Sequence, residues 1–320
     1  SNISNVICKR TLTLRHKSQN VYAGGLCGYN LKSKSNNDEN SLNVKNSLFI
    51  GSLKYYCNNL GFVGGIIGNN GDLKNGNKED EKNYQNCYFI EDLSLTPSRS
   101  VEYGTAISYA KFVKMIENKS ILTGDFSAYK NDEDIVESAG ETIKFAEGSI
   151  YNPININSET DFVSRDEENS LKNGKYYLLA NNLDLTNENT ISEINGNIIG
   201  NGHEVTVSKG FADKVNSDAI LADLIFNLVG TGEVGTGETY NNKEFVKTSF
   251  IVAKNNSGVI YNCVVKGNIT ASSTKIAPVA IENHGFINVV TSLALIIAKG
   301  ANASDAGVSG FVCENSGVVY

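Results

Sequence analysis

The chain has 320 residues, a net charge of −7 and an isoelectric point near 5.2. Its basic residues form no stripe that would attract a phosphate backbone, so we expect no nucleic-acid partner. No apolar run reaches the ~18 residues of a membrane-spanning helix, so we expect no membrane span in this segment. With 30 Gly, many Asn, three Pro, no Trp and hydrophobic residues in short runs, the composition favours a thin β-structured core over a helical domain.

The first stretch, residues 1–95, contains a short phrase that returns near the end of the chain. Its clearest copies are Gly25-Leu26-Cys27-Gly28-Tyr29-Asn30 and Gly65-Ile66-Ile67-Gly68-Asn69-Asn70, and looser copies end at Asn255, Asn283 and Asn315. In each copy two apolar residues precede a position that is usually small, and an Asn closes the phrase. We expect each copy to form a short buried strand leading into a tight turn, because Gly and Asn adopt left-handed backbone conformations readily.

A second phrase, in which Asn opens a strand, follows the first at a variable distance. These strands begin at Asn5, Asn46, Asn86, Asn262 and Asn288. Their spacing is too long for one hairpin and too irregular for a helical repeat, whose units keep a nearly fixed length. A parallel β-solenoid accommodates such differences, because loops leave the stack while the strands of successive coils pair. The sequence therefore predicts an all-β fold of stacked parallel coils.

Two polar excursions, 31–42 and 71–85, leave directly after Asn30 and Asn70. We expect them to emerge from the same edge of neighbouring coils and to lie side by side. Residues 96–150 lose the repeat and are interpreted as a linker or capping segment. Within it, residues 108–119 predict a short helix with Ser108 as N-cap.

Residues 151–320 are expected to form a second solenoid module. Strands are predicted at 175–179 and 183–185, with a strand, a Gly-Asn-Gly turn and a further strand over 197–207. A short helix is expected near Thr160. Tyr320 stops where another coil would place its Asn-led strand, so we expect an excerpt of a longer array, truncated at its C-terminal coil.

These residues resemble the GLUG repeats of bacterial surface proteins, a family that includes adhesins and non-catalytic regions of immunoglobulin-A proteases. The resemblance rests on the Gly-Leu-Cys-Gly and Gly-Ile-Ile-Gly phrases and on 175–185 followed by Gly200-Asn201-Gly202-His203, which is similar to the coils that precede such repeats. It covers about half of the chain. The pattern departs at Ala253, Ile281 and Cys313, which stand where the family has Gly. The resemblance implies a right-handed parallel β-helix, with short helical insertions here, on a bacterial cell surface, and it brings no catalytic residues.

Histidines and cysteines show no pattern of a catalytic or metal site. His203 and His284 adjoin turn residues, and neither G-x-S-x-G nor H-E-x-x-H occurs. The six cysteines form no C-x-x-C pair and no zinc-type spacing with His. Cys87 and Cys263 occupy the same inward position of their strands, so we expect all six to be reduced core residues. No catalytic residue, metal or cofactor is predicted.

Acidic clusters at Asp38-Glu39, Glu79-Asp80-Glu81 and Asp132-Glu133-Asp134 lie in polar segments. Three interpretations stay open for them: solvated loops, which the surrounding Asn, Lys and Ser favour, calcium binding, and catalysis. Catalysis deserves weighing because parallel β-helices also host polysaccharide hydrolases and lyases that use paired carboxylates. A raised carboxyl pKa, however, requires burial or a held partner.

Several of the tyrosines lie near predicted turns, where they either cover coil edges or bind a ligand. The predicted ligand site comprises Tyr29, Asp38, Glu39, Asp80 and Tyr84. We expect a non-enzymatic, extracellular repeat module with an adhesion or spacer role. Its partners would be a host glycan or extracellular protein, bound through 31–42 and 71–85, and neighbouring repeats of the same polypeptide. The alternative is a carbohydrate-active β-helix enzyme, a polysaccharide hydrolase or lyase, that uses loop carboxylates.

Overall fold

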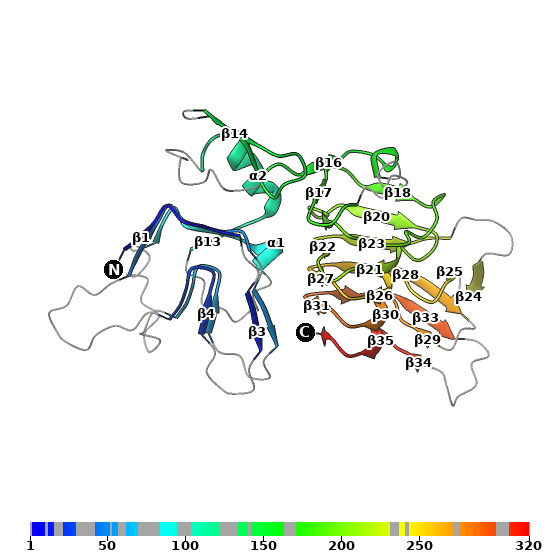
Figure 1. Ribbon diagram of the computed structural model, residues 1–320. Coiled ribbons are helices and arrows are strands. Elements are labelled where there is room, and N and C mark those ends of the chain that lie inside the picture. Colours follow the sequence, from blue (N-terminus) through cyan, green and yellow to red (C-terminus); the bar gives the residue numbers. More distant parts are fainter. Residues whose placement is uncertain are drawn as a thin grey trace. The chain divides into compact units, whose positions relative to one another are not determined.

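The computed structural model describes residues 2–9, 12–15, 22–29, 42–51, 53–56, 62–69, 84–94, 104–121, 134–139, 142–162, 171–230, 237–240, 243–271, 275–298 and 307–319. The chain divides into two compact units, Ser1–Leu122 (unit 1) and Thr123–Tyr320 (unit 2), and each is described by itself. Both consist mostly of short strands in parallel sheets, with few helices (Figure 1). The all-β prediction is confirmed at this level.

Unit 1 contains successive passages of the chain, here called rungs, whose strands pair in parallel. Two sheets each contain more than two strands. The first contains β1 (Asn2–Ser4), β6 (Asn43–Lys45) and β11 (Tyr84–Gln85); the second contains β2 (Ile7–Cys8), β7 (Leu48–Phe49), β12 (Tyr88–Ile90) and β13 (Thr105–Ile107). The remaining parallel pairs are β3 (Leu12–Arg15) with β8 (Leu53–Tyr56), β4 (Tyr22–Gly24) with β9 (Phe62–Gly64), and β5 (Cys27–Tyr29) with β10 (Ile67–Asn69).

The first glycine of each phrase in unit 1 leaves room for a phenylalanine of the following rung. The backbone N–H of Gly25 donates to the carbonyl of Gly65 at 3.0 Å, so the two phrases lie in register. A Cβ on Gly25 would lie 2.2 Å from the ring of Phe49, and one on Gly65 would lie 2.2 Å from the ring of Phe89. Both rings are buried. Packing against these rings, as well as turn geometry, therefore requires glycine at the first position of the phrase.

Unit 1 also contains the helix predicted at 108–119. It is α2 (Tyr109–Glu117), preceded by the short α1 (Glu91–Ser94). The Ser108 hydroxyl oxygen accepts a hydrogen bond from the Lys111 backbone N–H at 3.3 Å, which confirms the predicted N-cap. One difference from the sequence-based organisation is β13, which adds a parallel strand beyond residue 95. The unit division also falls inside the predicted 96–150 segment.

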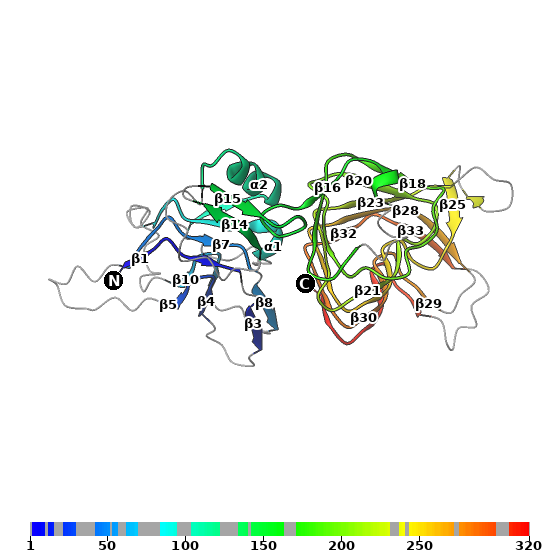
Figure 2. The ribbon, with the colours of Figure 1, turned by 45° about the horizontal axis from the view of Figure 1, so that its top comes forward.

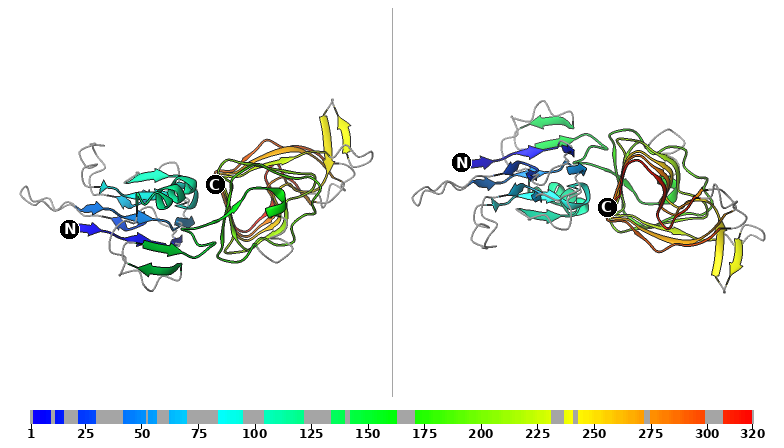
Figure 3. Two further views of the ribbon diagram at one scale, coloured as in Figure 1. Left: turned by 90° about the horizontal axis from the view of Figure 1, so that it is seen from above. Right: turned by 90° about the horizontal axis from the view of Figure 1, so that it is seen from below.

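Unit 2 has three parallel sheets, which the chain visits in turn (Figures 2 and 3). Sheet 1 contains β16 (Ile154–Ile156), β17 (Tyr176–Leu179), β19 (Asn197–Ile199), β22 (Ile220–Ala222), β27 (Val259–Tyr261), β31 (Phe286–Asn288) and β36 (Val318–Val319). Sheet 2 contains β18 (Leu183–Leu185), β20 (Glu204–Val207), β23 (Ile225–Leu228) and β28 (Val264–Ala271), which also pairs with β32 (Thr291–Ser292), β33 (Leu295–Ala298) and β25 (Lys243–Lys247). Sheet 3 contains β21 (Ala212–Val215), β26 (Ala253–Asn256), β30 (Ala280–Asn283) and β35 (Val312–Asn315).

The other strands of unit 2 lie outside these columns. β14 (Ile135–Ala139) and β15 (Thr142–Phe145) form an antiparallel pair, and β29 (Lys275–Ile276) pairs in parallel with β34 (Gly307–Val308). β24 (Gly237–Tyr240) instead joins the edge of sheet 2, where it pairs antiparallel with β25. The strands predicted at 175–179, 183–185 and 197–207 are confirmed by β17, β18, β19 and β20. Asn201 and Gly202, at the predicted turn between β19 and β20, both have positive φ.

The interior of unit 2 is a stack of aliphatic and aromatic side chains in register. In sheet 1 the inward column comprises Tyr177, Ile198, Leu221, Ile260 and Ile287, and in sheet 2 it comprises Leu183, Val205, Phe226 and Val265. All of these are buried. Because strand side chains alternate between faces, the register fixes every second residue in the core.

Sheet 3 carries a column of asparagines, of which Asn256 and Asn283 are buried and Asn315 is exposed. Asn256 pairs with Asn283, and Asn283 pairs with Asn315. The Asn256 amide donates to Asn283 Oδ1 at 2.8 Å, and the Asn283 amide donates to Asn315 Oδ1 at 2.7 Å. The sequence-based choice of Asn255 is therefore wrong by one residue, because Asn255 lies in register with Glu282. Burial distinguishes the two neighbours, since Asn256 is 0% exposed.

A second column consists of residues in the left-handed conformation between consecutive strands. In unit 1 these are Asn5, Asn46 and Asn86, and in unit 2 they are Asp223, Asn262 and Val289. The predicted opening residue Asn288 is again wrong by one, because it pairs with Tyr261, which places Val289 at the level of Asn262. Val289 has φ 55° and is 49% exposed. A β-branched residue is strained there.

We expect Val289→Asn to stabilise the protein by about 1 kcal/mol, because a left-handed conformation costs most L-residues ~1–2 kcal/mol and Asn less. Urea unfolding measures the change. Val289→Thr is the matched control, since it keeps the branched Cβ and should leave stability nearly unchanged. The converse change, Asn262→Val, should destabilise. Equal stability of Val289→Asn and Val289→Thr would contradict the strain.

We expect Gly65→Val to destabilise by about 3 kcal/mol or more, because the new side chain overlaps the Phe89 ring. The cost should fall in a Phe89→Leu background, which a double-mutant cycle measures. Gly310→Val is the control, because a Cβ on Gly310 meets nothing within 4 Å. A Gly65→Val chain as stable as the parent would refute the register of unit 1.

Candidate functional site

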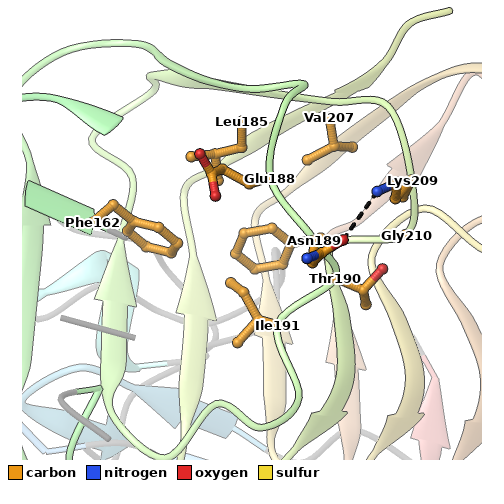
Figure 4. A pocket seen from close by; sticks show the side chains of 10 residues that line it. Phe162, Leu185, Glu188, Asn189, Thr190, Ile191, Val207, Lys209 and Gly210 are labelled. Carbon is orange, nitrogen blue, oxygen red and sulfur yellow. Dashed lines mark hydrogen bonds between the residues drawn. The ribbon is translucent and has the colours of Figure 1, made fainter. Parts of the chain in front are cut away.

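One candidate site is a pocket in unit 2, with a volume of about 170 Å³ (Figure 4). Two consecutive rungs supply most of it, through residues 185–191 and 207–211, and Phe162 comes from an earlier segment. Its floor is apolar and consists of Phe162, Leu185, Ile191, Val207 and Phe211, all of which are buried. The Phe162 and Phe211 rings are tilted at 33° with centroids 6.1 Å apart.

The rim of this pocket is polar. It is formed by Glu188, Asn189, Thr190 and Lys209, of which Asn189 and Lys209 are exposed. The Lys209 ammonium donates to Asn189 Oδ1 at 3.1 Å. The two contributing rungs are joined by a hydrogen bond from the Ser208 hydroxyl to the Thr186 carbonyl and by one from the Ile191 N–H to the Phe211 carbonyl. The walls of the pocket are therefore held in place by the hydrogen bonds between the two rungs.

The outer face of sheet 2 carries a polar cluster centred on Glu204. The Asn227 amide donates to Glu204 Oε1 at 2.8 Å, and the Lys266 ammonium lies 3.5 Å from Glu204 Oε2. His203 Nδ1 lies 3.3 Å from Asn182 Oδ1. Asp184, Thr206, Asn227 and Lys266 stand in register on this face. Glu204 Oε1 thus has its partner in the adjacent strand β23, and Oε2 has its partner in β28, one strand further on.

The outer face of sheet 3 carries a charged column. Lys214 Nζ lies 2.7 Å from Glu193 Oε1, and this hydrogen bond lowers the pKa of Glu193. Further along the column Glu282 and Glu314 pair directly, which places like charges on neighbouring strands. Lys275 offsets their repulsion, because its Nζ lies 3.6 Å from Glu282 Oε1 and 2.6 Å from Glu314 Oε1. The bond to Glu314 raises the pKa of Lys275.

Ser316, His284 and Glu282 lie in a line that is superficially like a hydrolytic triad. His284 Nδ1 is 2.6 Å from Ser316 Oγ, and His284 Nε2 is 3.8 Å from Glu282 Oε2. A serine hydrolase also needs backbone donors aimed at the developing oxyanion. Here the N–H groups of Ser316 and Gly317 both donate to the Asn283 carbonyl, at 2.9 and 3.0 Å. The arrangement links rungs and lacks the donors that acyl transfer requires.

The residues of the sequence-based ligand site are only partly described. Tyr29 ends β5 and pairs with Asn69, and Tyr84 begins β11 and pairs with Val44. Gly28 and Gly68 lie in β5 and β10. The other predicted residues, Asn30, Asp38, Glu39, Asn70 and Asp80, lie outside the described residues. The roots of both excursions are therefore adjacent in neighbouring rungs. The predicted bounds 31–42 and 71–85 are too long at their ends, because Leu42 is buried and Tyr84–Gln85 form β11, while 31–41 and 71–83 lie outside the described residues.

Sequence reasoning missed the pocket. Its floor is drawn from two rungs and from Phe162, which belongs to no repeat copy. The rim residues come after the strands β18 and β20, where the sequence is like that of any polar turn. A usable signal was the aromatic pair Phe162 and Phe211 outside the phrases, although spacing alone does not bring them together. Within the described ranges, no group of three or more His, Cys, Asp or Glu is arranged to hold a metal ion.

Five cysteines are described: Cys8, Cys27, Cys87, Cys263 and Cys313. Cys57 lies outside the described residues. Burial raises the pKa of the Cys263 thiol to about 12, and it also raises the pKa of Cys87. The Cys263 thiol lies 3.1 Å from the Tyr261 carbonyl, its hydrogen-bond acceptor. Burial likewise raises the pKa of Tyr176 to about 12, with the Asp134 charge adding to the effect.

No protein-family model, characterised protein or solved structure matches the chain. None of the helices in the described ranges has the length and apolarity to cross a bilayer.

We expect Cys87 and Cys263 to resist iodoacetamide at pH 8 in the folded protein and to react fully in denaturant, because alkylation requires the thiolate. An unfolded thiol ionises near its usual 9.0 and folded Cys263 near 12, so the unfolded state loses its proton first. The free energy of unfolding should therefore fall as pH rises from 9 towards 12. Cys263→Ala should show less of this decline. Rapid alkylation of native Cys263 would contradict the burial.

Proposed function

We propose that the chain is a right-handed parallel β-helix that serves as a non-catalytic repeat module of an extracellular bacterial surface protein. The in-register columns of sheets 1, 2 and 3 support the repeat architecture, since seven parallel strands stack in sheet 1 and four in sheet 3. Right-handed winding is expected because crossovers between parallel strands are almost always right-handed. Surface location and GLUG family membership rest on the sequence resemblance.

Adhesion through the two excursions is supported by where they begin and end. Tyr29 and Asn69, the last described residues before them, pair. At the other end Val44, just after the first excursion, pairs with Tyr84, where the second excursion already returns to the sheet as β11. We propose that the two loops, which connect paired strand ends of adjacent rungs, together provide one combined binding surface. This adjacency is the observation that carries the adhesion proposal, with a host glycan or extracellular protein as the partner.

The enzyme alternative receives less support from the described carboxylates. A glycoside hydrolase needs a carboxylic acid whose pKa is raised beside a second carboxylate. Glu204 is engaged by Asn227 and Lys266, and Glu282 and Glu314 share Lys275. Glu193 has its pKa lowered by Lys214. These contacts stabilise ionised carboxylates and favour a structural role for the outer faces.

We expect deletion of 33–40 together with 74–82 to leave thermal unfolding unchanged and to abolish binding on glycan and extracellular-matrix arrays. The reason is that the paired strand ends remain while the combined loop surface is lost. Deletion of 300–305, a segment of unit 2, is the control and should preserve binding. Retained binding after the double deletion would dismiss the loop surface as the adhesive site.

An activity assay on the purified chain distinguishes the enzyme alternative from the proposed adhesin. Release of reducing ends from a polysaccharide panel, abolished by Glu204→Gln, would replace the proposed function by the alternative.

A further inference from the structure

We propose that the pocket of unit 2 binds a single pyranose residue, such as the terminal sugar of a glycan chain. The inference rests on the proposed adhesive function for its ligand class, and it places a second binding site on the repeat stack itself. The pocket shows the usual character of a small-molecule site, an apolar concavity with a few placed polar groups.

The volume of the pocket fits one ring. At about 170 Å³ it is comparable to a cavity of ~150 Å³ that accepts benzene, so it holds one six-membered ring and not a disaccharide. Phe162 and Phe211 supply the aromatic part of the floor. A pyranose presents an apolar face of C–H groups that packs on such a surface.

The rim distinguishes a sugar from a purely apolar ring. The Glu188 carboxylate accepts hydrogen bonds, Lys209 donates them, and Asn189 and Thr190 do both. Neighbouring hydroxyls of a pyranose likewise both donate and accept. The rim carries one cation and one anion, so its formal charge is zero, which suits a neutral polyol better than an anion or a cation.

The pocket is held in shape before any ligand arrives. The Ile191 N–H donates to the Phe211 carbonyl at 2.9 Å, and the Asp213 N–H donates to the Ile191 carbonyl at 2.8 Å. Ser208 and Thr186 bind across the same two rungs. Ligand binding therefore costs little conformational entropy of the backbone around the pocket. The exposed Lys209–Asn189 contact must be exchanged for contacts to the ligand, at small cost because it is solvated.

The test is binding of a panel of methyl pyranosides to the full chain, followed through backbone amide shifts of Thr190 and Gly210 by NMR. We expect at least one neutral pyranoside to bind with a dissociation constant of about 1 mM, as a small ligand with few contacts allows. Glu188→Gln and Lys209→Met should each weaken it by about tenfold. Lys266→Met, which removes a half-buried lysine of sheet 2 away from the pocket, is the matched control and should leave binding unchanged.

Ile191→Trp should fill the pocket and eliminate binding, while thermal unfolding reports whether the variant folds. Should it fail to fold, the rim variants alone decide. No shift with any pyranoside at tens of millimolar, or tighter binding of indole than of every pyranoside, would overturn the inference. The chain lacking 33–40 and 74–82 should still bind. Its array result tests the loop surface, so failure of one site is distinguishable from failure of the other.

Discussion

Close approach of successive rungs at positions without side chains is the constraint on which the stack depends. In unit 2 the residues Gly258, Gly285 and Gly317 follow Asn256, Asn283 and Asn315 at the same offset. A Cβ on Gly285 would lie 2.1 Å from the Gly258 carbonyl oxygen, and one on Gly317 would lie 2.2 Å from that of Gly285. The asparagines beside them donate to one another across rungs, and Asn283 Oδ1 also accepts from the Gly285 N–H at 3.2 Å, whereas the buried Asn256 Oδ1 has no hydrogen-bond partner among the described residues. Glycine thus permits the close spacing, and the asparagines form a partly buried ladder of side-chain hydrogen bonds across it.

The repeat could be recognised in the sequence because these constraints allow only a few residue types at the affected positions. Gly25 and Gly65, the Ser108 cap and the turn at 200–202 were each predicted from a local requirement that few residues meet. The two register errors have a common cause. Asn255 and Asn256 are chemically identical, and Asn288 precedes Val289, which adopts the left-handed conformation that Asn262 has in the rung before. A slip of one residue exchanges the two faces of a strand, and only burial against the neighbouring rung decides between them.

The candidate sites were harder to predict than the ladder because no repeat specifies them. The pocket is lined by residues 185–191 and 207–211, from two rungs, and by Phe162. Its shape depends on the path that these segments take after they leave the strands. Composition predicts such segments as solvated turns. The excursions were recognised from their polarity, and the pairing of Tyr29 with Asn69 and of Val44 with Tyr84 supplies what the sequence lacked, the adjacency of their roots.

In-register stacking also determines what the outer faces can do. Each outward residue lies directly beside its counterpart in the next rung. A charge that recurs in two rungs is therefore placed next to a like charge, as Glu282 is next to Glu314. Such a face is stable only when a cation bridges the pair, as Lys275 does, or when amides and hydroxyls intervene, as Asn227 does between Thr206 and Lys266. Polar groups on these faces are therefore largely used by one another. Groups free to recognise a ligand are found where the register is interrupted, at loops and at turns between sheets, and the proposed glycan contacts fall in those two places.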